Sequence, residues 1–246
     1  MTDLRFMKLA VDPTMIPGVY NTCNQWCDYC PVTERCLAFR CRPRLDAGGD
    51  IYNDIAEAMH ESMNFLKECH EAEGLTPPED LMRLLNDDPR KSAKHVPLDD
   101  ALEKMAKHYA FLAAAFLKTS GHDLESIPKR SDGPTPFDVF FYYHVLIAIK
   151  ISRAIMSSAE AARNGSAEAR RDANVSAKVA LHGIDSSDEA LQVLALDDAD
   201  PRIQHMRRHL ARLRREVEGR FPKARALVRA GLDDAASARY PAGISR

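Results

Sequence analysis

The sequence lacks the features that would place the chain in a membrane or outside the cell. Its strongest apolar run, near Phe137–Ile149, is shorter than the roughly 20 residues that a membrane helix needs and contains Tyr142, Tyr143 and His144. The start, MTDLRFMKLAVDP, has no continuous apolar segment of the kind found in a signal peptide. We therefore expect a soluble cytoplasmic protein of bacterial type that does not contact a membrane.

Excess charge of one sign and glycine-rich loops are also missing. The 34 Lys and Arg residues nearly balance the 36 Asp and Glu residues, so the net charge is −2 and gives no general attraction to nucleic acid. No glycine-rich phosphate loop occurs, so nucleotide binding has no support. Basic residues between Arg202 and Arg229 follow an acidic stretch, Asp185–Asp200. We expect these opposite charges to neutralise each other within the fold.

A helical pattern follows an N-terminal segment of different composition. From Ile51 onward, apolar residues recur at spacings of three and four, which is typical of amphipathic helices. The pattern predicts helices over residues 50–73, 79–85, 98–119, 137–162, 167–182, 186–197, 202–219 and 222–231, the last beginning at Pro222. We therefore predict an all-α protein. A helical bundle would occupy residues 49–246, and a small cysteine-rich metal-binding module would occupy residues 1–48.

Five of the six cysteines lie close together near the N-terminus, in the run TCNQWCDYCPVTERCLAFRC. They are Cys23, Cys27, Cys30, Cys36 and Cys41, whereas Cys69 stands alone. Thiolates are strong ligands for zinc and iron. Because cytoplasmic thiols stay reduced, the clustering favours a metal over disulfides. The sequence therefore predicts a cysteine-ligated metal centre with these five residues as candidate ligands.

Two kinds of metal centre fit the spacing of these cysteines. A [4Fe–4S] cluster needs four thiolates, which Cys23, Cys27, Cys30 and Cys36 would supply. Tetrahedral Zn²⁺ is the alternative, with Cys27 and Cys30 as one pair and Cys36 and Cys41 as the other. We favour the [4Fe–4S] cluster, because three ligands crowd one short loop that neighbouring aromatic side chains would shield from water.

The two centres predict different classes of function. An iron–sulfur cluster predicts electron transfer to a redox partner, or a redox reaction at a pocket near the fourth predicted helix. A zinc ion would instead hold the N-terminal segment together as a structural element. It predicts a helical interaction or regulatory protein that binds a protein partner and has no catalytic activity. The sequence leaves open whether the chain is an enzyme, names no substrate, and leaves the oligomeric state open.

The fourth predicted helix carries polar residues within a largely apolar sequence. His144 lies on one face, and Asp138, Tyr142, Lys150 and Arg153 follow a separate strip. A buried polar strip on a central helix is a candidate lining for a ligand cavity. We expect instead that Asp138 and Arg153 reach solvent and that His144 is a core residue with its hydrogen bonds satisfied. If a second site exists, it should lie on this helix.

The segment CNQWCDYC resembles the Cys-x3-Cys-x2-Cys loop of radical S-adenosylmethionine enzymes. Cys23, Cys27 and Cys30 carry the resemblance, with Tyr29 at the usual aromatic position. It implies a [4Fe–4S] cluster with one iron open to S-adenosylmethionine. Those enzymes place the loop in a β/α barrel, whereas this chain has a helical pattern, and Cys36 would fill the open position. The resemblance is therefore confined to the loop.

A wider resemblance is to uncharacterised bacterial proteins with an all-helical body and a YNxCxxWCxxCPxxxRC-like start. The residues that carry it run from Tyr20 to Cys36. The tail FPKARALVRAGLDD, Phe221–Asp234, is similar to the end of the same group. The resemblance covers most of the chain and implies an all-helical fold, but it implies no activity.

Overall fold

The computed structural model describes residues 9, 11–41, 100–119, 133–197 and 200–233. The helices predicted over residues 50–73 and 79–85, the predicted domain boundary at residue 48 and Cys69 lie outside this part. The elements in the described ranges are α2 (Val19–Thr22), the 3-10 turns η1 (Cys27–Tyr29) and η2 (Thr33–Arg35), α3 (Leu37–Cys41), α7 (Ala101–Thr119), α8 (Pro136–Asn164), α9 (Ala167–Asp197) and α10 (Pro201–Arg220). No strand occurs in these ranges, which confirms the prediction of an all-α protein.

The chain divides into two compact units. One unit comprises residues 1–13 and 38–97, and the other comprises residues 14–37 and 98–246. Four of the clustered cysteines, Cys23 to Cys36, therefore belong to the same unit as the long helices. Cys41, the last residue of α3, belongs to the first unit.

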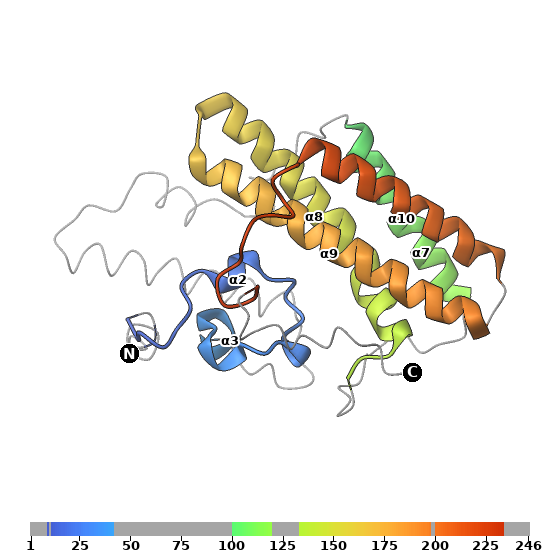
Figure 1. The fold of residues 1–246 in the computed structure, drawn as a ribbon, viewed down its shortest axis with the longest axis horizontal. Coiled ribbons are helices and arrows are strands. Elements are labelled where there is room, and N and C mark those ends of the chain that lie inside the picture. The colour runs from blue at the N-terminus through green and yellow to red at the C-terminus, as the bar shows by residue number, and fades with distance from the viewer. Residues whose placement is uncertain (1–8, 10, 42–99, 120–132, 198–199, 234–246) are drawn as a thin grey trace, which may run out of the picture. The chain divides into compact units, whose positions relative to one another are not determined.

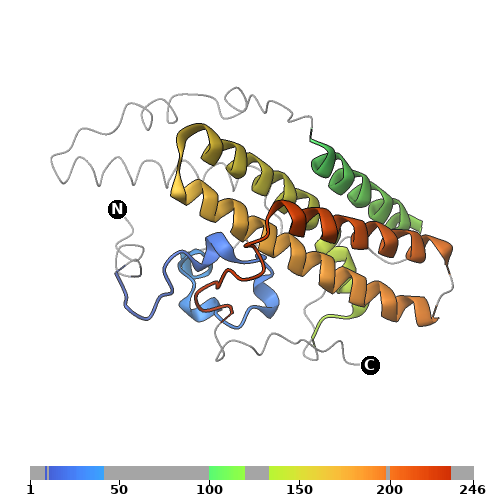
Figure 2. The same ribbon diagram turned by 45° about the horizontal axis from the view of Figure 1, so that its top comes forward.

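In the second unit, α7, α8, α9 and α10 lie side by side as a helical bundle (Figures 1 and 2). The contacts join α7 to α8, α8 to α9, α9 to α10, and α10 back to α7, which closes a ring around a shared interior. The α8–α9 contact is the most extensive, because a short turn after Asn164 folds one long helix directly onto the next. This arrangement agrees with the predicted bundle.

Apolar side chains fill the bundle interior. The apolar seam of α10 is at most 1% exposed at every position, namely Ile203, Met206, Leu210, Leu213 and Val217. On α9, Gly183 allows α8 to approach closely, since a Cβ atom there would lie 2.9 Å from Cδ1 of Tyr143. Close packing of the helices and burial of apolar side chains therefore stabilise this unit.

The ends of α8 follow from local sequence signals. The backbone N–H of Asp138 donates to Oγ1 of Thr135 at 3.2 Å, and the N–H of Thr135 donates to Oδ2 of Asp138 at 2.8 Å. This reciprocal capping box, with Pro136 in the first turn, fixes the start of the helix. Gly165, with φ of 71°, ends it. Asp138 is therefore a buried cap, and the expectation that it reaches solvent was wrong.

Two of the helix predictions differ from the structure. The segments predicted as separate helices over residues 167–182 and 186–197 form the single helix α9, because Gly183 serves close packing and does not end the helix. Residues 222–231 form turns instead of a helix. There, Nζ of Lys178 donates to the carbonyl oxygens of Arg225 and Leu227, which satisfies backbone groups outside any helix.

The acidic and basic stretches pair with each other across the bundle, as predicted. Nε of Arg207 lies 2.8 Å from Oδ1 of Asp188, and Nε of Arg214 lies 2.9 Å from Oδ1 of Asp185. Arg225 also pairs with Asp185. Arg207, Arg214 and Arg225 are therefore paired with aspartates of α9.

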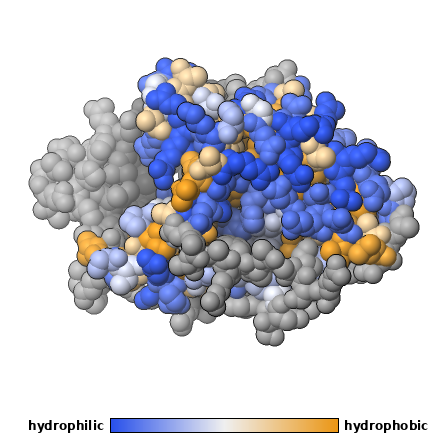
Figure 3. Space-filling model, in the orientation of Figure 1, coloured by the Kyte–Doolittle hydropathy of each residue, from blue (hydrophilic) through white to orange (hydrophobic). Residues whose placement is uncertain are grey.

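The face of the bundle in Figure 3 is largely hydrophilic, with separate hydrophobic patches. By length and composition α8 could cross a membrane, since the helix extends well beyond the apolar run near Phe137–Ile149. Half of its apolar window is nevertheless buried inside the fold. The central helix of a bundle has the same composition, so this property alone does not indicate a membrane protein.

Candidate metal centre

Residues 23–36, which we call the cysteine loop, are folded by two tight turns that each end at a cysteine. The N–H of Cys30 donates to the carbonyl oxygen of Cys27 at 3.2 Å, closing η1. The N–H of Cys36 donates to the carbonyl oxygen of Thr33 at 3.1 Å, closing η2. Turns of this kind are short and compact. They keep four thiols within one small segment.

The backbone next to Cys23 adopts a strained conformation. Gln25 has φ of 65°, a left-handed value that residues other than glycine rarely adopt. In this conformation its N–H donates to Sγ of Cys23 at 3.3 Å. The Cys23 thiol in turn donates to the carbonyl oxygen of Tyr20 at 3.5 Å. A backbone N–H directed at sulfur favours the thiolate form, which is the form that binds metals.

Aromatic stacking seats the cysteine loop on α8. The ring of Trp26 lies parallel to that of Tyr142, with centroids 4.3 Å apart and an interplanar angle of 6°. Its edge contacts are with Tyr143, at 5.9 Å, and with Tyr29, at 5.1 Å. Trp26 is only 7% exposed. These rings form an apolar layer between the loop and the bundle.

Two hydrogen bonds of Asn24 also join the loop to α8. Nδ2 of Asn24 donates to the hydroxyl of Tyr143 at 2.6 Å, and the hydroxyl of Tyr142 donates to the carbonyl oxygen of Asn24 at 2.8 Å. Asn24 is 3% exposed. Burial raises the pKa of Tyr143 to about 12 and raises the pKa of Tyr142 as well, so both phenols remain neutral. These hydrogen bonds thus fix the position of the loop along α8.

The environment of Cys23 disfavours a free thiolate. Burial is the largest cause that raises its pKa, and the nearby Cys30 and Cys36 raise it further. The hydrogen bond from Gln25 and the charge of Lys150 act in the opposite direction. Cys23, Cys27, Cys30 and Cys36 are not joined in disulfides, and Cys36 is buried. A metal that replaced the thiol protons would remove the repulsion between thiolates.

The thiol groups suit a soft metal, but in the described residues they are not grouped into a metal site. Within those residues, no three His, Cys, Asp or Glu side chains are grouped closely enough to hold a metal ion. The chemistry of four cysteines outside any disulfide on one loop fits zinc or an iron–sulfur cluster. Because thiol sites commonly form as the metal binds, the loop would have to draw its sulfurs together on binding.

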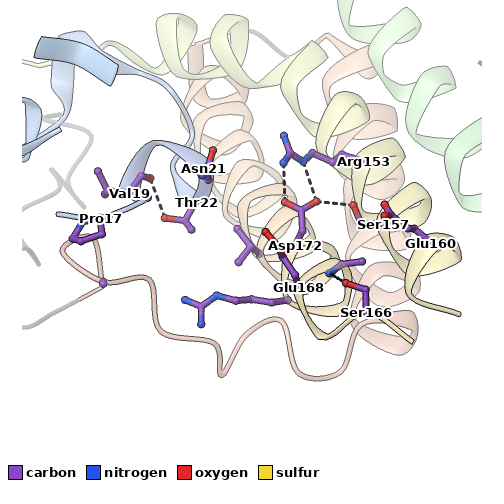
Figure 4. A pocket seen from close by; sticks show the side chains of 15 residues that line it. Pro17, Val19, Asn21, Thr22, Arg153, Ser157, Glu160, Ser166, Glu168 and Asp172 are labelled. Atoms are coloured by element: carbon purple, nitrogen blue, oxygen red, sulfur yellow. Dashed lines mark hydrogen bonds and ion pairs between the residues drawn. The ribbon is translucent and has the colours of Figure 1, made fainter. Parts of the chain in front are cut away.

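A polar pocket of about 630 Å³ adjoins the start of the cysteine loop (Figure 4). Asn21 and Thr22 line one side, Arg153 and Asp172 line another, and Ala230 belongs to the chain after α10. Thr22 directly precedes Cys23 in the sequence. A small polar molecule in this pocket would therefore lie beside the loop.

Asp172 is the centre of a hydrogen-bonded cluster in the pocket wall. Nε and Nη2 of Arg153 donate to its two carboxylate oxygens at 3.0 and 2.8 Å, and Oγ of Ser157 donates to Oδ2 at 2.6 Å. Burial acts to raise the pKa of Asp172, but the bonds from Arg153 and Ser157 outweigh it and lower that pKa. The carboxylate is therefore ionised and already engaged.

Lys150 lies on the same face of α8 as Tyr142 and Arg153, at helical spacings of eight and three residues. It is only 6% exposed, and burial lowers its pKa. His144 lies elsewhere on α8. Its Nδ1 donates to the carbonyl oxygen of Phe141, and burial lowers its pKa, so its ring is neutral and satisfied.

The structure thus divides the residues predicted from the sequence into two groups. Tyr142 bonds to the cysteine loop and Arg153 lines its pocket, while Asp138 caps the start of α8 and His144 bonds within α8. No motif or spacing in the sequence marked Asn24, Ser157 or Asp172 as site residues. Asp172 lies 19 residues after Arg153, so only the packing of α9 on α8 brings the two together.

No family model, curated protein or solved structure matches the chain. The assignment of function therefore rests on the residues of the chain itself.

Proposed function

We propose that the cysteine loop holds a cysteine-ligated metal centre, with a [4Fe–4S] cluster as the first candidate and a redox role. Cys23, Cys27, Cys30 and Cys36 would supply the thiolates, and Cys41 remains a reserve ligand. The supporting observation is that four cysteines outside any disulfide share one folded loop, which aromatic contacts and hydrogen bonds hold on the bundle. When bound, such a cluster accepts and donates single electrons.

The way the loop is attached favours a redox role over a purely structural one. Trp26, Asn24 and the two tyrosines of α8 fix the loop to the bundle through ring stacking and hydrogen bonds. A metal that only stapled the loop would add little to this attachment. The stack of Trp26 on Tyr142 instead supplies an apolar layer, and limited access of water is one determinant of cluster potential.

The pocket beside Thr22 means that a redox centre in the loop could act in two ways. In the first, the centre exchanges an electron with a redox partner protein at the exposed side of the loop. In the second, a small polar molecule bound between Thr22 and Arg153 would give one electron to the oxidised cluster or take one from the reduced cluster, and a redox partner protein would then restore the cluster. The polar walls of the pocket support the second form, since they offer hydrogen bonds to a ligand of that kind.

Zinc is the second candidate, and the turn η1 favours it specifically. This turn closes Cys27 and Cys30 over two intervening residues, the spacing by which many zinc sites place two sulfurs on one ion. In that case the loop would be an interaction or regulatory element without catalysis.

Anaerobic purification of the full-length chain distinguishes the candidates. An iron–sulfur protein is brown, has broad visible absorption that dithionite bleaches, and contains iron and acid-labile sulfide. A colourless protein with one equivalent of zinc by elemental analysis would exclude the redox role. A chain that binds neither metal would overturn the proposal as a whole.

Cysteine substitutions test the assignment of ligands. Cys30→Ser should empty the site for either metal, because a ligand at the end of η1 is lost. Cys69→Ser is the matched control, since it removes a thiol outside the cluster and should leave the metal content unchanged. If Cys30→Ser retained the full metal content of the wild type, Cys30 would not be a ligand.

A further inference from the structure

We infer that Cys27 and Cys30 form a reversible dithiol–disulfide pair, which exchanges with small disulfide molecules when the loop holds no metal. Such a pair needs only two sulfurs, so it goes beyond the proposed metal centre and depends on neither iron nor zinc. Its substrate class is a low-molecular-weight disulfide, for which oxidised glutathione is the probe. Disulfides that form in a reducing compartment are mostly transient and serve catalysis or redox sensing.

The turn η1 places Cys27 and Cys30 on the same side of the chain. The N–H of Cys30 donates to the carbonyl oxygen of Cys27 at 3.2 Å, so the two residues are the ends of one 3-10 turn. Such a turn rises about 2 Å per residue and aligns its first and fourth side chains, which puts their Cα atoms about 6 Å apart. Disulfides usually join Cα atoms that lie about 4.4–6.8 Å apart. The backbone of η1 therefore has a spacing that a disulfide can bridge.

Solvent reaches both residues of this pair. Cys27 and Cys30 are each partly exposed, and Asp28 between them is exposed. Thiol–disulfide exchange requires direct contact between the attacking sulfur and the disulfide of the substrate. A small disulfide can therefore approach the turn without unfolding of the bundle.

Cys23 is engaged by contacts with the neighbouring backbone. Its thiol donates to the carbonyl oxygen of Tyr20 at 3.5 Å and accepts a hydrogen bond from the N–H of Gln25 at 3.3 Å. The left-handed backbone of Gln25 also interrupts any helical geometry between Cys23 and Cys27. The regular turn that aligns Cys27 with Cys30 therefore has no counterpart on the Cys23 side.

Cys36 ends the second turn, η2, and faces a hydroxyl where Cys30 faces a thiol. The N–H of Cys36 donates to the carbonyl oxygen of Thr33 at 3.1 Å, so Thr33 holds the position in η2 that Cys27 holds in η1. Cys36 is also only 8% exposed. The two turns thus share one backbone geometry, but of the two only η1 carries a cysteine at both ends.

Aromatic contacts hold η1 in place on α8. Trp26, directly before the turn, stacks on Tyr142, and Tyr29, within the turn, contacts the indole at a ring-centroid distance of 5.1 Å. Because these contacts order the backbone of the turn, closing the ring costs little further conformational entropy. We therefore expect the pair to be oxidised more readily in the folded chain than in the denatured chain.

The exchange proceeds in two balanced steps. One thiol of the pair loses its proton, and its sulfur attacks the disulfide of glutathione. The glutathione S–S bond breaks, a mixed disulfide forms, and one glutathione leaves and takes up a proton. The second thiol then loses its proton and attacks the protein sulfur of the mixed disulfide, which forms the Cys27–Cys30 bond and releases the second glutathione. The pair gives up two electrons and two protons, and one oxidised glutathione becomes two reduced molecules.

The test uses the full-length chain, reduced in the presence of a metal chelator and then equilibrated in glutathione buffers that contain the chelator. Acid quenching, alkylation of the remaining thiols and digestion with trypsin give residues 9–35 as one peptide, which contains Cys23, Cys27 and Cys30. Fragment masses should show this peptide lighter by two hydrogen atoms, with the alkyl label on Cys23 alone. Circular dichroism verifies that the chain is folded in the chelator.

The same chain in urea is the matched control for the role of the turn. There the three cysteines of the peptide should give a mixture of all their pairings. The equilibrium constant for the Cys27–Cys30 pairing should be about tenfold larger in the folded chain, which corresponds to the prior ordering of about one residue of backbone. An equal constant in urea would contradict the role of η1.

Single substitutions separate the two steps of the exchange. Cys27→Ser and Cys30→Ser should each stop at the mixed disulfide, so that each chain retains one glutathione and releases one instead of two. Cys69→Ser is the control, since it removes a cysteine outside the loop and should release two as the wild type does. If either single variant still released two, the pair would be wrongly assigned.

Several outcomes would overturn the pair. These are a folded chain that forms no disulfide, a disulfide that joins Cys30 to Cys23, and loss of helix content in the chelator, since the pair needs the folded turn without a metal. The metal content of a separate sample, prepared without chelator, tests the proposed metal centre. A chain that holds a metal can fail the exchange test, and a chain that holds none can pass it, so the two failures are distinct.

Discussion

The helical bundle and the cysteine loop belong to one compact unit but are held by different interactions. The bundle has long seams of apolar side chains, such as those of α10, which are almost completely buried. The loop has a single buried indole, a few aromatic edges and the hydrogen bonds of Asn24. Many small contacts therefore stabilise the bundle, whereas a few specific contacts position the loop and leave its thiols available for chemistry.

The largest effect should come from the bundle core. Leu210→Ala removes a side chain with 0% exposure from the α10 seam and should lower the free energy of unfolding by about 2–5 kcal/mol. Urea titration followed by circular dichroism measures this loss. Below the unfolding transition the metal content should equal that of the wild type. Simultaneous loss of metal from folded protein would contradict the division between the two regions.

A substitution at Gly183 tests the role of Tyr143, whose side chain contacts both the bundle and the cysteine loop. A Cβ atom at this position meets Tyr143 at 2.9 Å and Ile147 at 3.1 Å, so Gly183→Ala should cost about 1–3 kcal/mol through overpacking. Because Tyr143 also holds Asn24, the loop should become more sensitive to limited proteolysis. Gly219→Ala is the control, since a Cβ atom on α10 there meets nothing within 4 Å. An equal loss of stability at Gly219 would contradict the packing argument.

A hydroxyl deletion should affect the loop more than the bundle. Tyr143→Phe leaves the buried amide of Asn24 without its partner and should cost about 1–2 kcal/mol. We expect faster proteolysis within the cysteine loop and nearly unchanged helix content. Tyr109→Phe is the control, because within the described residues the buried hydroxyl of Tyr109 lies near that of Ser187 without forming a hydrogen bond to it. Its removal should not destabilise the chain, and a loss as large as that of Tyr143→Phe would contradict the comparison.

The smallest effect, and the one that depends on pH, concerns the chain after α10. Burial acts to raise the pKa of Asp233, but the bonds from Arg229 and Lys178 lower it well below its ordinary value of 3.8. A carboxyl group whose pKa falls on folding contributes stability above pH 3.8, and that contribution is lost as the pH falls toward the lower, folded value. Asp233→Asn should therefore cost about 1 kcal/mol at pH 7 and progressively less below pH 3.8. Urea titrations at several pH values measure this difference, and a constant difference would exclude the ionic origin.

The bundle could be predicted from the sequence because its signals are local. The seam of α10 follows directly from apolar spacing, and the starts of α8 and α10 carry proline in the first turn. The predicted break near residue 183 was wrong, since glycine there serves contact with Tyr143, a residue far away in the sequence. The helix predicted over residues 222–231 was wrong because Lys178 of α9 satisfies carbonyl groups in that segment.

The candidate site could be predicted only in part. Spacing alone indicated that Cys23, Cys27, Cys30 and Cys36 share one loop, and their role as metal ligands remains a prediction. Spacing on α8 also grouped Tyr142, Lys150 and Arg153, but it could not show that the cysteine loop lies on this strip. That contact depends on the stacking of Trp26 and on the packing of α9, which no local pattern contains.

The stack of Trp26 on Tyr142 has a practical consequence, because this indole is the only tryptophan in the chain. Light emitted after excitation at the red edge of the tryptophan band comes from the cysteine loop alone and carries no signal from the four long helices. Detachment of the loop should shift this emission to longer wavelength while the ellipticity at 222 nm is still that of native protein. The fluorescence of Trp26 thus reports on the cysteine loop, which is the region where we propose the metal centre.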